Sequence, residues 1–325
     1  MSDERDREVA VQAVMEAARL CAAVRRKMVG EALLKKADES PVTVADFGSQ
    51  ALVCQRIREA FPGDVVVAEE DASALRQPEN AGLLEQVRTY VDSFRAGVTA
   101  ETLCAWIDLG NGAVDERYWT LDPIDGTKGF LRNDQYAVAL ALVEAGEVKV
   151  GVLACPALPV DPAQPELGCG ALFVAVRGEG TEMFPLCGGK AAPVRVATEP
   201  AARNWRFAES VEAAHGNHEL QASIARQVGF RGPSLRMDSQ AKYCAVARGD
   251  AVLYLRLPAS GQPDYREKIW DHAAGSIVVE EAGGRATDMH GRPLDFGSGY
   301  RMEKNRGVVV SNGAIHDAVV KTLGQ

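Results

Sequence analysis

Residues 135–155, QYAVALALVEAGEVKVGVLAC, constrain the fold more than any other stretch of this 325-residue chain. Two long apolar segments flank a turn at Gly146, which is the pattern of a β-hairpin. Before it, the chain predicts helices over residues 5–29 and about 44–60 and a short buried strand over 65–67. The last third alternates strands with helices, which is typical of layered α/β structure.

The order of these elements predicts an α+β first part followed by an α/β second part. The Gly- and Pro-containing stretch 187–202 is the best candidate for the junction between them. We therefore divide the chain into residues 1–198, which carry most of the acidic motifs described below, and residues 199–325.

Composition excludes several classes of protein. With 46% apolar and 25% charged residues, the chain has the composition of a soluble globular protein. No apolar run approaches the roughly 20 residues that span a bilayer, so we expect no membrane association. The net charge of −9 argues against binding to a nucleic-acid backbone, which requires a basic face.

The cysteines and the first residues favour a cytoplasmic protein. The N-terminal stretch MSDERDREVA is acidic, unlike a secretion signal or a transit peptide. The seven cysteines form no CxxC motif, so we expect reduced thiols. Because no His/Cys cluster has zinc spacing, a bound metal would have carboxylate ligands, which suit Mg²⁺. No obligate protein partner is evident.

Residues 121–132, LDPIDGTKGFLR, carry the chemistry that the chain suggests most clearly. Pro123 favours an extended conformation at Asp122, so we expect a strand to end there and the chain to turn at once. The amides of Gly126 and Thr127 would then face an anion, and Asp122 and Asp125 would share a divalent cation. The stretch therefore predicts a combined metal and phosphate site.

Two other interpretations of this stretch compete. Asp, Pro and Gly are common in surface turns, but the flanking YWTL and GFL are apolar and should be buried, where carboxylates need partners. A DxDGT motif marks phosphatases that form an aspartyl phosphate, but its two aspartates are two residues apart. The three-residue spacing here, with Pro123 between the aspartates, disfavours that mechanism.

Three further acidic segments could complete a metal site, since one carboxylate pair rarely holds the ions that catalysis needs. Glu69 and Glu70 leave the short strand together, Asp46 lies early in a helix, and Asp271 follows Trp270 in IWDHAAG. Each also has a simpler explanation: a solvated strand end, a first-turn helix charge and an N-cap, respectively.

Together LDPIDGTKGFLR, VAEED and IWDHAAG resemble the motifs of the lithium-sensitive, magnesium-dependent phosphatases, the superfamily of inositol monophosphatase and fructose-1,6-bisphosphatase. With SPVTVADFGSQA, MDSQAKYC and LYLRLP, the chain looks closest to 3′(2′),5′-bisphosphate nucleotidases of the yeast and plant type. The resemblance covers nearly the whole chain. It implies a layered αβαβα sandwich with the site between its two parts, and two or three Mg²⁺ ions as cofactors.

The resemblance also implies roles for individual residues. The implied metal ligands are the carboxylates of Glu69, Asp122, Asp125 and Asp271 and the carbonyl of Ile124. The implied water-activating pair is Asp46 and Thr127. The implied substrate contacts are Gly126, Thr127, His215, Ser239, Lys242 and Arg256. Arg256 also stands out without the resemblance, because a charge within the apolar LYLRL needs an anionic partner, which a second phosphate would provide.

The implied activity is hydrolysis of the 3′-phosphate of adenosine 3′,5′-bisphosphate, a small phosphorylated nucleotide, by a metal-activated water, with 3′-phosphoadenylyl sulfate as a second substrate to test. Two alternatives remain open. One is a phosphatase of inositol phosphates or sugar phosphates on the same metal site. The other is a non-catalytic nucleotide sensor, against which the complete carboxylate set argues, because binding alone needs no water-activating pair.

Overall fold

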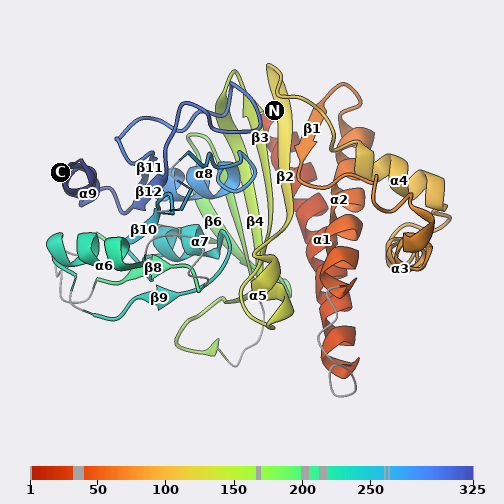
Figure 1. Ribbon diagram of the computed structural model, residues 1–325, viewed down its shortest axis with the longest axis horizontal. Helices are drawn as coiled ribbons and strands as arrows, with labels where there is room; N and C mark the ends of the chain where they lie inside the picture. The colour runs from red at the N-terminus through yellow and green to blue at the C-terminus, as the bar shows by residue number, and fades with distance from the viewer. Residues whose placement is uncertain are drawn as a thin grey trace.

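We describe the protein from a computed structural model in which residues 2–31, 40–165, 170–198, 205–211, 218–230, 232–259, 261–262 and 264–324 are placed. Five layers stack across the molecule, with helices alternating with sheets (Figure 1). The fold is the αβαβα sandwich that the resemblance implied. None of the described helices is long and apolar enough to cross a membrane.

The outer helical layer on one side consists of two long helices, α1 (Ser2–Glu31) and α2 (Ser40–Ala60). They pack against each other and cover one face of the first sheet (Figure 1). Beside them lie the short helices η1 (Pro78–Asn80), α3 (Ala81–Asp92) and α4 (Ala100–Asp108). Thr99 caps α4 by accepting a hydrogen bond from the Thr102 amide.

The first sheet has its seven described strands in sequence order, β1 to β7, and only the β1–β2 pair is parallel. Its strands are β1 (Val65–Ala68), β2 (Arg117–Asp125), β3 (Ala137–Glu144), β4 (Glu147–Pro159), β5 (Gly170–Val176), β6 (Gly180–Pro185) and β7 (Ala192–Val194). The predicted hairpin is the β3–β4 pair, and its turn includes Gly146 at φ 76°.

The second sheet has the strand order β11-β12-β10-β8-β9, with β10 antiparallel to β12 and parallel to β8. Its strands are β8 (Phe207–Glu209), β9 (Leu235–Arg236), β10 (Leu253–Arg256), β11 (Arg285–Thr287) and β12 (Val308–Ser311). Helices α7 (Ala241–Ala247) and α8 (Ala273–Glu281) lie between the two sheets, and α6 (His218–Gln227) and α9 (His316–Leu323) form the last layer (Figure 1).

Three apolar clusters fill the spaces between these layers. Strand β3 contributes to two of them: Leu140 and Leu142 belong to the cluster with α1 and α2, whereas Ala139 and Ala141 belong to the cluster with α7 and α8. Both faces of the strand are therefore buried, which explains why the hairpin is apolar at nearly every position.

The structure corrects two expectations about the chain near its motifs. β2 does not end at Asp122 but continues to Asp125, with a register shift between these two residues in its pairing with β3. Pro123 is tolerated there because pairing with β1 stops at Leu121, so no donor is needed on that side. The composition of residues 156–170, rich in Pro and Gly, predicts a surface loop, but β4 extends to Pro159 and β5 begins at Gly170.

A third correction concerns the cysteines. Cys187, which is exposed, is disulfide-bonded, so the expectation of reduced thiols is wrong for this residue. Five others are buried free thiols: Cys21, Cys54, Cys104, Cys155 and Cys244. The proposed division at residue 198 stays a prediction; the first sheet ends at Val194 and the second begins at Phe207, yet α8 packs against strands of both.

Candidate active site

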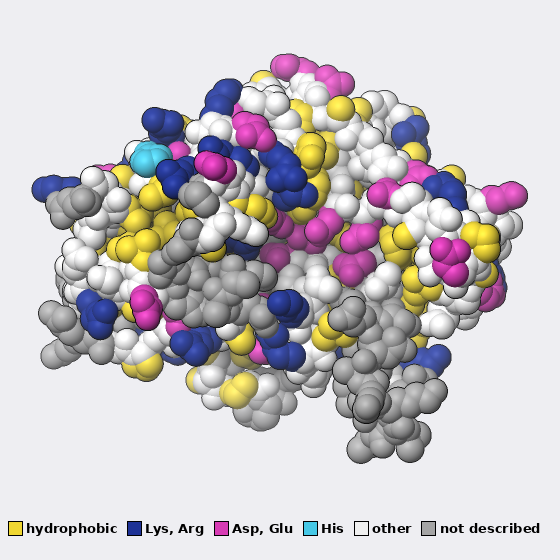
Figure 2. Space-filling model, viewed as in Figure 1, with side chains coloured by type: hydrophobic (Ala, Val, Ile, Leu, Met, Phe, Trp, Pro, Cys, Tyr) yellow, Lys and Arg dark blue, Asp and Glu magenta, His cyan; other side chains and the backbone are white. Residues whose placement is uncertain are grey.

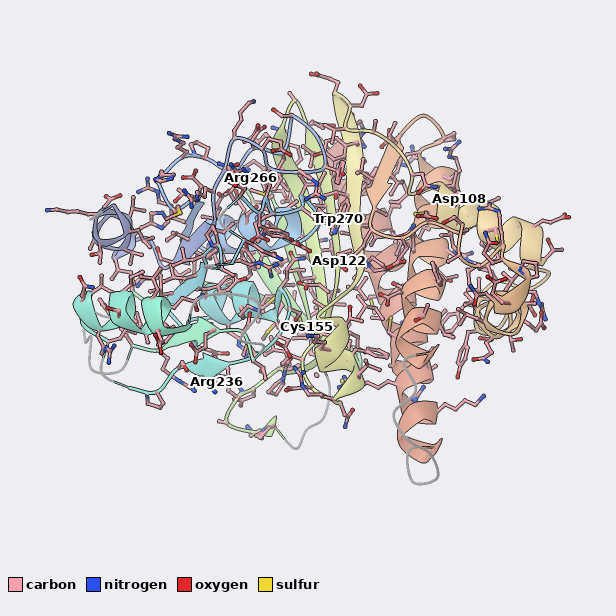
Figure 3. All side chains as sticks on the ribbon, in the orientation of Figure 1. Asp108, Asp122, Cys155, Arg236, Arg266 and Trp270 are labelled. Carbon is pink, nitrogen blue, oxygen red and sulfur yellow. The ribbon has the colours of Figure 1, made fainter. Side chains whose placement is uncertain are left out.

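A pocket of about 320 Å³ lies where the end of β2, the short helix α5 (Thr127–Leu131) and the segments before α7 and α8 meet. In Figure 3 its residue Asp122 lies near the middle of the molecule, with Trp270 close by in the view. Acidic side chains gather in a hollow at the centre of the face shown in Figure 2. The pocket thus brings together segments that lie far apart in the sequence.

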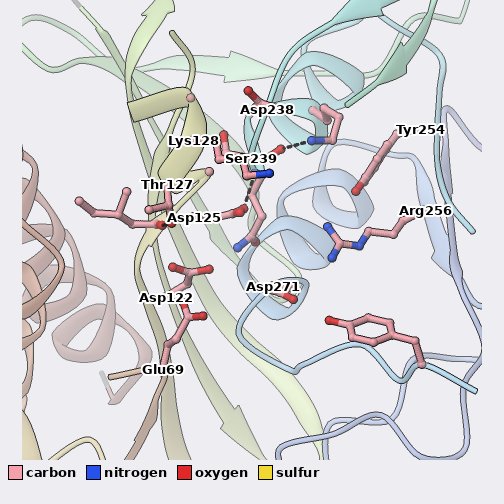
Figure 4. Close-up of a pocket in the computed structure, with 16 residues that line it drawn as sticks. Glu69, Asp122, Asp125, Thr127, Lys128, Asp238, Ser239, Tyr254, Arg256 and Asp271 are labelled. Atoms are coloured by element: carbon pink, nitrogen blue, oxygen red, sulfur yellow. Dashed lines mark hydrogen bonds between the residues drawn. The ribbon is translucent and has the colours of Figure 1, made fainter. Parts of the chain in front are cut away.

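One wall of the pocket is a cluster of carboxylates (Figure 4). Asp122, Asp125 and Asp271 each place an oxygen so that the three atoms lie within 4.8 Å of one another. Glu69, at the end of β1, lines the same pocket. One oxygen of Asp122 is buried without a hydrogen-bond partner. Three segments of the chain therefore deliver four carboxylates to one place.

The pKa values of these carboxyl groups show how strongly they are crowded. Burial, followed by the charges of Asp271 and Glu70, raises the pKa of Glu69 to about 8. Burial and Glu69 raise the pKa of Asp122 well above its usual value. For Asp125, burial and Asp271 raise the pKa to about 6, although nearby cationic side chains oppose the rise.

The donor set of this cluster fits a hard divalent cation. Burying several carboxylates together is unfavourable unless positive charge compensates them. The ligand atoms of Asp122, Asp125 and Asp271 are all oxygens, which Mg²⁺ prefers. The buried Asp122 oxygen that has no hydrogen-bond partner is an atom that a metal ion would bind. The buried Ile124 also lines the pocket, and the role of its carbonyl as a further oxygen ligand stays a prediction.

The DPIDGT turn positions two of these carboxylates through a glycine and a backbone donor. Gly126 adopts φ 86° at the start of α5, and a Cβ there would lie 2.8 Å from the Cβ of Ser239. The amide of Gln240 donates to Asp125 at 2.5 Å. The Gln240 side chain in turn donates to the carbonyl of Trp270 at 2.9 Å, which connects the Asp125 and Asp271 segments.

Helix α2 holds the backbone next to Asp122 and Glu69 through two polar side chains. The hydroxyl of Ser49 donates to the carbonyl of Pro123 at 3.0 Å. The buried Gln50 side chain donates to the carbonyls of Glu70 and Ile107 and accepts from the Glu70 amide at 3.0 Å. Consecutive residues of one helix therefore hold the backbones beside Asp122 and Glu69.

The predicted pair of Asp46 and Thr127 lies at the edge of this cluster. Asp46 is buried in α2, and burial, then Glu70 and Glu69, raise its pKa well above the usual value. The Thr127 hydroxyl lines the pocket and donates to the Ile124 carbonyl at 3.4 Å. Within the described residues it makes no hydrogen bond to Asp46, so their joint role stays a prediction.

The opposite wall of the pocket carries the predicted cations. Lys242 is buried and donates from Nζ to the carbonyls of Ser239 at 2.8 Å and Met237 at 3.3 Å. Burial lowers its pKa to about 8, although Asp125 opposes the shift. Arg256, at the end of β10, also lines the pocket. Ser239 precedes α7 with φ 65°, a left-handed conformation that a residue other than glycine adopts only when its surroundings hold it there.

Comparison with known proteins identifies the family of this chain. The sequence model described as the inositol monophosphatase family matches residues 3–325. The chain belongs to the inositol monophosphatase family. This family member is 42% identical to a protein of Emericella nidulans named 3′(2′),5′-bisphosphate nucleotidase, over 99% of the chain and 98% of the relative. It is 44% identical to a protein of the same name from Oryza sativa, over 97% and 92%.

Solved structures support the fold of this family member. An inositol monophosphatase from Zymomonas mobilis covers 100% of both chains with a TM-score of 0.64 at 19% identity. An inositol monophosphatase from Anabaena gives a TM-score of 0.63 at 20% identity, over 100% of this chain and 97% of its own. At these identities the likeness establishes the αβαβα architecture alone.

The structure also identifies residues of this family member that the sequence did not single out. Tyr254 and Tyr265 line the pocket beside Arg256, and Glu267 forms an ion pair with Arg256 at 2.9 Å. The apolar surroundings of Arg256 signalled the need for an anionic partner, but not that the protein supplies one. His215, predicted to contact substrate, lies outside the described residues.

Proposed function

We propose that this protein is a Mg²⁺-dependent 3′(2′),5′-bisphosphate nucleotidase that hydrolyses adenosine 3′,5′-bisphosphate to AMP and phosphate. One observation carries the proposal: carboxylates from distant segments converge on one wall of a pocket whose other wall carries Lys242 and Arg256. The fungal and plant relatives named as such nucleotidases, at about 40% identity over nearly the full length, support the choice of substrate.

The two walls suit a substrate with two phosphates. A phosphate can approach a group of carboxylates only through bound cations, whereas Lys242 and Arg256 can bind a second phosphate directly. We assign the scissile 3′-phosphate to the acidic wall and the 5′-phosphate to the basic wall. Inositol monophosphates and sugar monophosphates would leave the basic wall without a partner.

The chain's own groups perform the following steps in this proposal. The carboxylates of Glu69, Asp122, Asp125 and Asp271 and the Ile124 carbonyl would hold the ions. Bound Mg²⁺ supplies charge neutralisation for the phosphate oxygens and lowers the pKa of a coordinated water. Gly126 and Thr127 bind the scissile phosphate, and Ser239 and His215 contact the nucleotide.

Water activation requires a proton acceptor close to the acidic wall. The Thr127 hydroxyl orients the attacking water, and Asp46, whose raised pKa makes it a better base than an ordinary carboxylate, receives the proton. No covalent intermediate is needed.

Three further predictions rest on composition and charge alone. They are that the protein does not bind nucleic acid, that it needs no protein partner, and that it is cytoplasmic.

The first test is phosphate release from adenosine 3′,5′-bisphosphate by the purified protein with Mg²⁺, compared with inositol phosphates and sugar phosphates. We expect Mg²⁺-dependent turnover with the highest kcat/KM on the bisphosphate. Preference for an inositol phosphate would favour the alternative phosphatase, and tight binding without turnover would favour a sensor. We expect Asp125→Asn to remove most of kcat, whereas Lys242→Ala should mainly raise KM.

A further inference from the structure

Glu267 makes a buried ion pair with Arg256 that the proposed reaction leaves unexplained. We propose that Glu267 is a positioning residue, which aims the Arg256 guanidinium at the second phosphate of the substrate and keeps it away from the metal-binding carboxylates. This inference rests on the proposed function, since it assumes a substrate with a phosphate at the basic wall.

The contacts of Glu267 form a chain of buried polar groups. Arg256 Nε lies 2.9 Å from Glu267 Oε2, and His272 Nε2 lies 3.2 Å from the same oxygen. The other ring nitrogen of His272 lies 2.6 Å from the hydroxyl of Tyr243. The side chains of Glu267 and His272 are 6% and 1% exposed, so water cannot replace these contacts.

Proton positions in this chain follow from the chemistry of its members. Burial opposes ionisation of Glu267, but the charge of Arg256 and the bond to His272 outweigh it and lower the pKa of this carboxyl group to about 2. An ionised carboxylate only accepts hydrogen bonds, so His272 must carry its proton on Nε2. In the neutral imidazole, Nδ1 then accepts from the Tyr243 hydroxyl, which burial keeps protonated by raising its pKa.

The position of Glu267 determines which part of Arg256 faces the substrate. Nε is bound to Glu267, and Figure 4 shows the terminal nitrogens directed toward the side where Asp271 and Ser239 lie. The hydroxyls of Tyr254 and Tyr265 also interact with the Arg256 side chain. A guanidinium presents a fork of donors that matches a phosphate. Because Glu267 fixes Nε, it also sets the direction in which the two terminal nitrogens of Arg256 point.

Arg256 would otherwise have competing partners. It lies close enough to Asp125 and Asp271 for their charges to affect one another. A direct Arg256–Asp271 pair would neutralise a carboxylate that the cation site needs. Glu267 supplies a nearer counter-charge, and its own backbone is fixed because its carbonyl accepts from the Met302 amide at 2.9 Å.

The same chain of buried polar groups includes the sequence neighbours of residues on both walls of the pocket. His272 follows Asp271 in the sequence, and Tyr243 follows Lys242. A change at Glu267 therefore alters the aim of Arg256 first, while the positions of Lys242 and Asp271 retain their other supports, including the Gln240 bonds to Trp270 and Asp125.

The test compares Glu267→Gln with the wild type on two substrates, adenosine 3′,5′-bisphosphate and adenosine 3′-phosphate, which lacks the second phosphate. For the bisphosphate we expect KM to rise about tenfold while kcat changes by less than about twofold. The reason is that the contact between Arg256 and the second phosphate would be weakened equally in the ground state and in the transition state. For the 3′-monophosphate we expect no change. Glu59→Gln, an exposed glutamate on α2 outside the pocket, is the matched control and should leave both substrates unaffected.

A double-mutant cycle with Arg256→Met separates positioning from a general structural role. If Glu267 acts through Arg256, the double variant Arg256→Met/Glu267→Gln should have the KM of Arg256→Met alone. The double variant also removes both buried charges, so it keeps the test valid if Glu267→Gln alone misfolds. AMP affinity measured by calorimetry should follow the same pattern.

The proposal is overturned if Glu267→Gln lowers kcat equally on both substrates, or if its effect adds to that of Arg256→Met. Failure of the proposed function would look different, because the wild type itself would then not hydrolyse the bisphosphate.

Discussion

At the scale of single residues, the dominant feature is the crowding of buried carboxylates on one wall of the pocket. Two of them have raised pKa values near neutrality, about 8 for Glu69 and about 6 for Asp125. Protons and divalent cations therefore compete for the same oxygens, and both should stabilise the folded protein.

This competition predicts how stability depends on pH. For a carboxyl group with a raised folded-state pKa, the native state binds more protons than the unfolded state between the two pKa values, so stability falls as pH rises. With chelator present, we expect the melting temperature to fall between about pH 4.5 and about pH 8. Mg²⁺ should raise it more at pH 8 than at pH 5.

The measurement is thermal denaturation across this range with EDTA or excess Mg²⁺. Glu69→Gln, which removes the carboxyl group whose pKa is raised to about 8, should flatten the pH dependence in EDTA. An equal gain from Mg²⁺ at pH 5 and pH 8 would contradict the assignment of these carboxylates to one cation site.

At the scale of elements, the site depends on short connections whose geometry is set by neighbouring helices. Gly126 is one such position, because it combines a positive φ with close contact to Ser239. The strand end that carries Asp122 and Asp125 can approach the segment before α7 only if no side chain intervenes.

We expect Gly126→Ala to lower both stability and kcat. A left-handed conformation costs an alanine about 1–2 kcal/mol, and the contact at 2.8 Å requires Ser239 to shift as well. Gly178→Ala is the matched control, since Gly178 has φ 84° and open space around its Cβ position. The control should lose a similar amount of stability from φ alone and keep full kcat; equal kcat in both variants would contradict the prediction.

A second prediction concerns the role of α2 behind the acidic wall. Gln50→Met keeps the volume but removes the hydrogen bonds that hold the backbone at Glu70. We expect the Mg²⁺ concentration for half-maximal activity to rise several-fold, because Glu69 is then less well oriented. Gln55→Met on the same helix is the control; its Oε1 is buried without a partner, so activity should not change.

At the scale of the whole molecule, charge is distributed unevenly. The chain carries a net charge of −9, yet a second, cationic pocket is lined by Arg266, His290, Arg292, Lys304 and Arg306, with Asp295 and Glu303 as its acidic members. Arg266 of this pocket directly follows Tyr265, which lines the active site, and Figure 2 shows Lys and Arg side chains gathered beside the acidic hollow. A positive region next to the entrance can guide an anionic substrate toward an acidic protein.

We therefore expect kcat/KM for the bisphosphate to fall with rising ionic strength. Arg292→Gln/Arg306→Gln should lower kcat/KM about two- to fivefold at low salt and have little effect near 0.5 M salt, where the charges are screened. Arg226→Gln/Lys321→Gln, which removes two charges from α6 and α9, is the control. A salt dependence that is identical in all three proteins would exclude this contribution.

Much of this organisation could be predicted from the chain, because it rests on local signals. The long apolar runs of β3 and β4, the DPIDGT turn and the acidic residues that follow β1 are short-range patterns, which can be recognised without the tertiary structure. The continuation of β2 through Pro123 could not be predicted, since it depends on where pairing with β1 stops.

By itself, the sequence determined the order of helices and strands and the types of side chain that a metal and phosphate site requires, because local propensity and side-chain chemistry are properties of the residues themselves. Only the tertiary structure decided that Glu267 is the partner of Arg256, that Gln50 and Gln240 hold the acidic segments, and that Ser239 lies in a left-handed conformation. These features are contacts between residues brought together by packing, and packing depends on the whole set of layers rather than on any one segment.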